Sequence, residues 1–66
     1  MDLSPKSLIA FLKERGYELD RISGSHHIFI NEKLNHSIPV PIHGNRDLKL
    51  GTYKGIQKMV INHSKQ

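Results

Sequence analysis

Two prolines separated by a single residue constrain the fold of this chain more than any other local feature. They are Pro39 and Pro41, and they alternate with apolar residues in the segment 37–42. The N–H groups of residues i and i+2 point to the same side of a strand, so these prolines remove donors from one side only. The other side keeps its donors and can pair. The segment is therefore predicted to be an edge strand, with its three apolar side chains on one face.

A short amphipathic helix is predicted near the N-terminal end. Ser4 is a typical N-cap, and Pro5 suits the first helical position, where a missing N–H costs nothing. Apolar residues recur at spacings of three and four between Leu8 and Leu12, which is the period of a helix with one buried face. Gly16 follows as a residue that ends helices.

The remaining segments complete an alternation of helix and strand. We expect strands at 17–23 and 26–31, a polar turn at 32–36, a polar loop at 43–51, a second helix from 53 to about 62 capped by Thr52, and a frayed polar tail at 62–66. The expected buried stripe of the second helix is Tyr53, Ile56, Met59 and Val60. Gly55 weakens that helix, unless it allows close approach of a backbone or a ligand. The predicted fold class is α+β, with a three-stranded antiparallel sheet, two helices on one face and a single domain over residues 1–66.

Size and composition narrow the function classes. The chain has 66 residues and no cysteine, which excludes a disulfide framework or a thiolate metal site and favours a cytoplasmic setting. Its beginning has no apolar signal-peptide region, and its longest apolar run, 8–12, is far too short to cross a membrane. The formal net charge of +4 suits a polyanionic partner such as nucleic acid, or an acidic protein, although many small proteins are mildly basic without a specific reason.

The sequence Gly24-Ser25-His26-His27 lies at the expected turn between the first two strands. A Gly-Ser pair gives a flexible backbone and a small hydroxyl, and imidazole is the side chain that exchanges protons near neutral pH. Alternation places the two histidines on opposite faces. If Ile28 and Ile30 form the core, His27 faces the open side and His26 must be reached at the end of the sheet. The residues alone leave this choice open, and either histidine could simply be satisfied by backbone hydrogen bonds.

These landmarks together resemble the HicA-type mRNA interferase toxins of bacterial toxin–antitoxin pairs. The matching segments are Gly24-Ser25-His26 with Phe29, Val40-Pro41-Ile42-His43, and Leu50-Gly51-Thr52 before the second helix. The resemblance implies a fold like that of double-stranded-RNA-binding domains. It also implies an endoribonuclease that cleaves mRNA without a metal or other cofactor, with His26 as its catalytic residue. The implied protein partner is an antitoxin of the HicB type that masks the site.

Such a reaction needs few protein groups, because RNA carries its own nucleophile in the 2′-OH. A histidine that removes its proton contributes about 10²–10⁴-fold as a general base. Donors and cations must then meet the charge that develops on phosphorus. The candidate RNA-binding residues are Gly24, Ser25, Lys49, Thr52, Lys54 and Lys58. Lys54 and Lys58 share one helix face, which is also what an ordinary solvated face would show.

Other functions stay open at this level. His36 and His63 are expected to be solvated, and His43 either contacts RNA or has no role. The histidines lack the spacing and the acidic companions of a metal site. The alternatives to a ribonuclease toxin are a non-catalytic RNA-binding module, in which His26 only contacts a phosphate or a 2′-OH, and a small protein-interaction adaptor.

Overall fold

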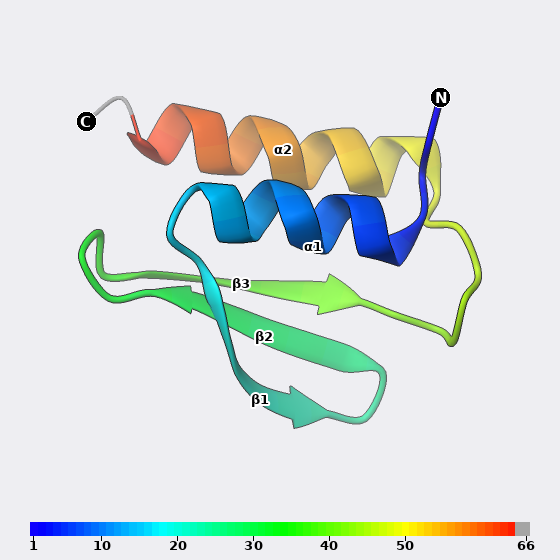
Figure 1. Cartoon of the computed structure of the whole chain (residues 1–66), viewed down its shortest axis with the longest axis horizontal. Helices are drawn as coiled ribbons and strands as arrows, with labels where there is room; N and C mark the ends of the chain where they lie inside the picture. Colours follow the sequence, from blue (N-terminus) through cyan, green and yellow to red (C-terminus); the bar gives the residue numbers. More distant parts are fainter. Residues whose placement is uncertain (65–66) are drawn as a thin grey trace.

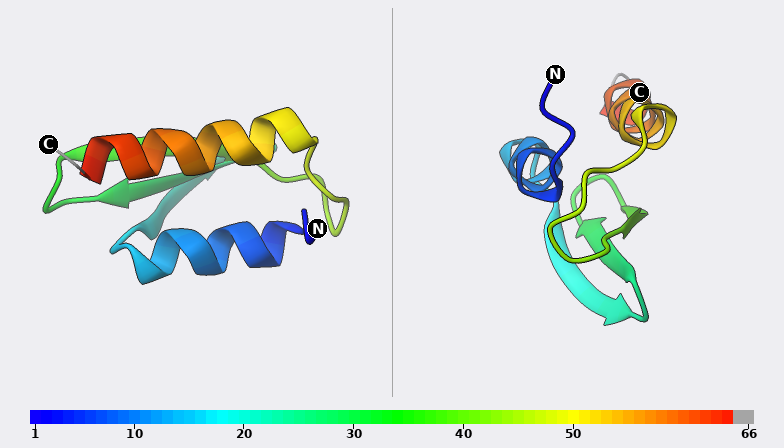
Figure 2. Two further views of the ribbon diagram at one scale, coloured as in Figure 1. Left: turned by 90° about the horizontal axis from the view of Figure 1, so that it is seen from above. Right: turned by 90° about the vertical axis from the view of Figure 1, so that its right-hand side faces the viewer.

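The computed structural model describes residues 1–64. The elements are α1 (Pro5–Glu14), β1 (Glu18–Ser23), β2 (His26–Asn31), β3 (His36–Pro41) and α2 (Leu50–Ser64). The strands form one antiparallel sheet in the order β1-β2-β3 (Figure 1). Both helices lie on the same side of this sheet, which leaves its other face open (Figure 2). This arrangement confirms the expected α+β fold of the double-stranded-RNA-binding type.

Local signals fix both ends of α1, as predicted. The Ser4 hydroxyl accepts a hydrogen bond from the N–H of Ser7 at 3.2 Å. At the other end, the N–H of Gly16 donates to the Lys13 carbonyl at 3.1 Å, and the N–H of Tyr17 donates to the Leu12 carbonyl at 3.0 Å. These two bonds and the φ of +89° at Gly16 form a Schellman motif, which turns the chain toward β1.

The edge position of β3 confirms the interpretation of the two prolines. β3 pairs with β2 alone. Just beyond the strand, the N–H of Ile42 donates to the Ser25 carbonyl at 2.8 Å. N–H groups two residues apart share a side, so the donors at 38, 40 and 42 face β2, and Pro39 and Pro41 face outward. The outer edge of β3 is therefore poor in donors.

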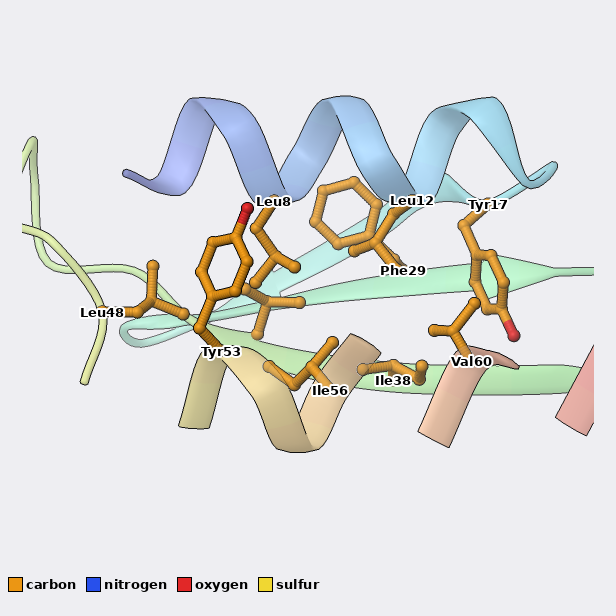
Figure 3. Close-up of a cluster of buried hydrophobic side chains, with 10 residues drawn as sticks. Leu8, Leu12, Tyr17, Phe29, Ile38, Leu48, Tyr53, Ile56 and Val60 are labelled. Carbon is orange, nitrogen blue, oxygen red and sulfur yellow. The ribbon is translucent and has the colours of Figure 1, made fainter. Parts of the chain in front are cut away.

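The hydrophobic core fills the space between the helices and the sheet. Side chains from α1, α2 and the sheet converge there (Figure 3). The core residues are Leu8, Leu12, Tyr17, Phe29, Ile38, Val40, Leu48, Tyr53, Ile56 and Val60. Leu48 was expected in a polar loop, but it is buried, and its N–H donates to the Leu3 carbonyl at 2.9 Å. Met59 was expected in the buried stripe and is instead exposed, because α2 packs with a narrower stripe.

The second helix begins earlier and ends later than its sequence pattern indicates. The Lys49 carbonyl accepts the first helical bond, from the N–H of Tyr53 at 2.9 Å. Thr52 therefore lies inside α2, and the prediction that it caps the helix was wrong. The buried Leu48 anchors the chain two residues before the helix, so α2 begins directly after this anchor and not at Thr52. Its far end continues through Ser64, where a frayed tail was expected, and positions 65–66 of that tail lie outside the described residues.

Candidate nucleic-acid site

A tight hairpin presents His26 at one end of the sheet. Ser23 and His26 pair directly across β1 and β2, which leaves Gly24 and Ser25 as the two turn residues. Gly24 has a φ of +61°, and Ser25 does not have a positive φ. That combination defines a type II′ turn, in which glycine is favoured at the first central position. Nothing lies within 4 Å of the position that a Cβ on Gly24 would occupy, so there is open space beside this turn.

The two adjacent histidines face opposite sides of the sheet. Phe29 is only 2% exposed and belongs to the core, and His27, two residues earlier, lies on the same helix-facing side. His27 is partly buried, and its Nδ1 atom is enclosed without a hydrogen-bond partner among the described residues. His26 is exposed and shares the open face with Ile28 and Ile30. The arrangement with Ile28 and Ile30 in the core was therefore wrong, because the helices pack over Phe29.

A hollow of about 390 Å³ lies beside this end of the sheet, between β3 and the start of α2. It is lined in part by Pro41, His43, Arg46, Lys49 and Thr52. Pro41 is also the residue of β3 that pairs with His26, so the hollow and the exposed imidazole lie next to the same strand residue. Arg46 and Lys49 give the hollow positive charge, and Asp47 also lines it. Arg46 was not among the predicted site residues, and for His43 the sequence had left open whether it contacts RNA or has no role.

The other two predicted RNA-binding residues lie elsewhere. Lys54 and Lys58 are exposed on α2, on the side away from the stripe that packs on the sheet. His26 belongs to the open face, on the opposite side of the sheet from the helices. Gly24, Ser25 and His26 nevertheless lie at the same end of the molecule as Lys49 and Thr52, because Pro41, the pairing partner of His26, lines the hollow together with these two residues. Lys54 lies about one helical turn after the start of α2 at Leu50, and Lys58 lies about one further turn along the helix.

A second polar cluster lies at the opposite end of the sheet, where solvated side chains were expected. The Tyr17 hydroxyl lies 2.6 Å from Nδ1 of His36. The rings of His36 and His63 are stacked, with centroids 3.9 Å apart and planes inclined by 12°. His36 and His63 are both partly buried, so the expectation of solvation was wrong for both. Burial lowers the pKa of His36 below its usual value, and the charge of His63 lowers this pKa further.

Two further properties concern the described part of the chain as a whole. Within residues 1–64, no group of three or more histidine, aspartate and glutamate side chains is arranged to hold a metal ion. Neither of the helices described here has the length and apolar character needed to cross a membrane.

The fold and the site define a small α+β protein of the double-stranded-RNA-binding type, with an exposed histidine at the end of its open sheet face. The family model described as the HicA toxin of bacterial toxin-antitoxin matches residues 5–63 of the 66. The chain therefore belongs to the HicA toxin family, and its role is that of the toxin in a pair with a cognate antitoxin. No curated protein and no solved structure matches it significantly.

Proposed function

We propose that this protein is a metal-independent endoribonuclease, an mRNA interferase that acts in the cytoplasm, with His26 as its general base. The observation that carries the proposal is the exposed position of His26 on the open face, beside a positively charged hollow, in a chain of the HicA toxin family. His27 is a weaker candidate, because it is partly buried on the helix-facing side. An extended RNA strand reaches the open face without any movement of the helices.

The reaction uses the nucleophile of the substrate. The imidazole of His26 takes the proton of a 2′-OH, and the 2′-oxygen attacks the adjacent phosphorus. The bond from phosphorus to the 5′-oxygen then breaks, and this oxygen takes a proton from water. The products are a 2′,3′-cyclic phosphate and a free 5′-OH, and His26 returns its proton to the solvent. No step needs a cofactor.

The remaining predicted residues have binding roles in this proposal. The open turn at Gly24 and Ser25 admits the strand next to His26. Lys49 and Thr52, which line the hollow, contact the phosphates that flank the cleaved bond. Lys54 and Lys58 extend the positive surface along α2 and hold more distant phosphates. Most of this affinity is independent of base sequence, because phosphate contacts carry no direct sequence information.

The decisive experiment is cleavage of RNA by the purified chain in excess EDTA, with His26→Ala and His27→Gln compared with the wild type. We expect cleavage by the wild type, about 10²–10⁴-fold slower cleavage by His26→Ala, and little change in His27→Gln. Circular dichroism checks that each variant is folded. Loss of wild-type activity on chelation would contradict the metal-independent reaction, and loss in His27→Gln with full activity in His26→Ala would exchange the two roles.

The same experiment separates the alternative of a non-catalytic RNA-binding module. Such a module would bind RNA, and its binding would weaken in His26→Ala, but no cleavage product would form with the wild type. The double-stranded-RNA-binding type of fold is the observation that favours this alternative. The formation of a 2′,3′-cyclic phosphate end distinguishes the two functions directly.

The cognate antitoxin, in this proposal, is an acidic protein of the HicB type that covers His26. Opposite charge favours its approach to the basic surface. The outer edge of β3 is a poor site for strand addition, because Pro39 and Pro41 remove its donors. The antitoxin is therefore expected to bind through side chains over the His26 region.

A further inference from the structure

An irregularity in β1 determines which of its side chains reach the open face. Leu19 pairs with Phe29, and Arg21 pairs with Ile28, so Asp20 is an extra residue between two consecutive pairs. This is a β-bulge, a feature that is common beside active sites, where it re-aims a side chain. Strict alternation would place Arg21 on the same side as Leu19, which pairs with Phe29 on the helix-facing side of the sheet. The bulge instead places Arg21 on the opposite side.

The consequence is that Arg21 shares the open face with His26. Their strands pair through Ser23 and His26, and the next pair on that face is Arg21 with Ile28. Arg21 and His26 are therefore diagonal neighbours, whose Cα atoms are about 7–8 Å apart in this geometry and within reach of a long side chain. Arg21 is also the only lysine or arginine in the three strands.

The Arg21 side chain is available to a ligand. It is 68% exposed, and its Nη1 lies 2.6 Å from Oδ2 of Asp20. An ion pair between two exposed neighbours contributes about 0–1 kcal/mol, so a phosphate can displace the carboxylate at little cost. The planar guanidinium can donate two parallel hydrogen bonds to phosphate oxygens.

We propose that Arg21 binds the phosphodiester that His26 attacks and stabilises the charge on its non-bridging oxygens. The inference rests on the proposed ribonuclease function. It assigns a residue to the stabilisation of charge on the attacked phosphate, since Lys49 and Thr52 were assigned to the flanking phosphates. When the 2′-oxygen bonds to phosphorus, negative charge grows on the non-bridging oxygens, and it falls again when the 5′-oxygen leaves. Arg21 donates hydrogen bonds throughout and transfers no proton. Because this charge is greatest in the transition state, Arg21 acts mainly on kcat.

The test compares single-turnover RNA cleavage by the wild type, Arg21→Gln, Arg21→Lys and Asp20→Asn. Lys13→Gln is the matched control, because it removes one exposed positive charge from α1. Affinity is measured separately with a fully 2′-O-methylated RNA, which cannot be cleaved. We expect Arg21→Gln to lower the cleavage rate about 10²-fold and the affinity much less. The cleavage rate of Arg21→Lys should lie between those of the wild type and Arg21→Gln. Asp20→Asn should bind the methylated RNA at least as tightly as the wild type.

A charge-preserving variant tests the role of the bulge. Ile22 is 57% exposed and pairs with His27 on the helix-facing side, so an arginine is tolerated there but points away from His26. Adding Ile22→Arg to Arg21→Gln restores the net charge, and we expect it not to restore cleavage. Rescue by this second change would overturn the inference, because charge alone would then suffice.

The outcomes separate this inference from the function on which it rests. A wild-type chain that cleaves no RNA would refute the proposed function, and the role of Arg21 would fall with it. A wild type that cleaves RNA, together with an Arg21→Gln variant as active as Lys13→Gln, would refute the role of Arg21 alone. A large loss in Arg21→Gln without rescue by Ile22→Arg is the result that supports it.

Discussion

The hydroxyl of Tyr17 lies 2.6 Å from Nδ1 of His36, and this contact links the connection between α1 and β1 to the start of β3. His63 of α2 extends it, because its ring stacks on His36 and its Nε2 lies 3.3 Å from the Leu34 carbonyl. Three elements thus meet around one partly buried imidazole, far from His26. The neutral form of that imidazole fits this place best, because both burial and the charge of His63 lower the pKa of His36.

Stability should therefore decrease in mild acid. The unfolded chain has a His36 pKa of about 6.5, and the folded chain has a lower one. As the pH falls from about 6.5 to the folded pKa, the unfolded state binds a proton that the native state does not, so the free energy of unfolding falls across this window. Urea unfolding at a series of pH values measures this loss of free energy of unfolding. His36→Gln should make the free energy of unfolding less dependent on pH below about 6.5. A pH dependence equally steep in His36→Gln would show that another group is responsible.

Two glycine substitutions should change stability in opposite directions. Gly16→Ala places a Cβ 3.1 Å from Nδ2 of Asn31 at a φ of +89°, so we expect a loss of about 1 kcal/mol or more. Gly55 lies within α2, and nothing lies within 4 Å of a Cβ added there, so Gly55→Ala should stabilise the protein by about 1 kcal/mol. Thermal unfolding of both variants checks these two predictions, with a melting temperature below that of the wild type expected for Gly16→Ala and one above it for Gly55→Ala. Destabilisation by Gly55→Ala would contradict the open surroundings of that position.

Removal of Lys54 and Lys58 should weaken RNA binding without changing the chemistry. For a single strand, each phosphate that a lysine no longer neutralises reduces the magnitude of the salt slope of binding by about 0.7. We expect Lys54→Ala with Lys58→Ala to flatten the log–log dependence of affinity on salt, measured with non-cleavable RNA. The control is Lys13→Ala with Lys33→Ala, which removes the same charge from exposed positions elsewhere. Equal slopes in the two double variants would mean that this face of α2 does not bind RNA.

Association with the cognate antitoxin should depend on salt. Charge steering is screened over a Debye length of about 8 Å at physiological ionic strength, so the on-rate should fall as salt is added. His26→Ala should mainly raise the off-rate, because it removes a side chain at the covered site. Stopped-flow measurements at two salt concentrations check both. An on-rate unaffected by salt, or a complex with a strand added along Pro39 and Pro41, would contradict the proposed docking mode.

Features that depend on near neighbours in the chain were predictable. Ser4 with Pro5 begins α1, and Gly16 ends it, because caps and a positive φ satisfy backbone groups within one turn. The position of β2 was predicted to the residue, and that of β3 was predicted one residue late. The hairpin that carries His26 followed from Gly24 and Ser25. Local sequence therefore placed the pair His26 and His27 at this hairpin, and the resemblance to the HicA family selected His26 as the proposed catalytic residue.

Features that depend on packing between elements were not predictable. Alternation shows that His26 and His27 face opposite sides, but it cannot show which side the helices cover; the burial of Phe29 decides that. Two local patterns in β1 give conflicting faces for Arg21. Alternation from Leu19 places Arg21 on the face of Leu19, and alternation from the hairpin pair Ser23 and His26 places it on the face of His26. The bulge at Asp20 lets Leu19 lie on the helix-facing side and Arg21 on the open face, and only pairing with β2 reveals it.

The sequence by itself thus determined the elements, their order and the edge character of β3, because caps, turns and missing donors act over a few residues. Tertiary structure alone decided the faces, the bulge and the stacking of His36 on His63, because these depend on how α1, α2 and the sheet exclude water together. The site on the open face is accordingly a product of both. Local sequence places His26 at the end of a strand, and packing on the opposite face leaves it exposed beside Arg21.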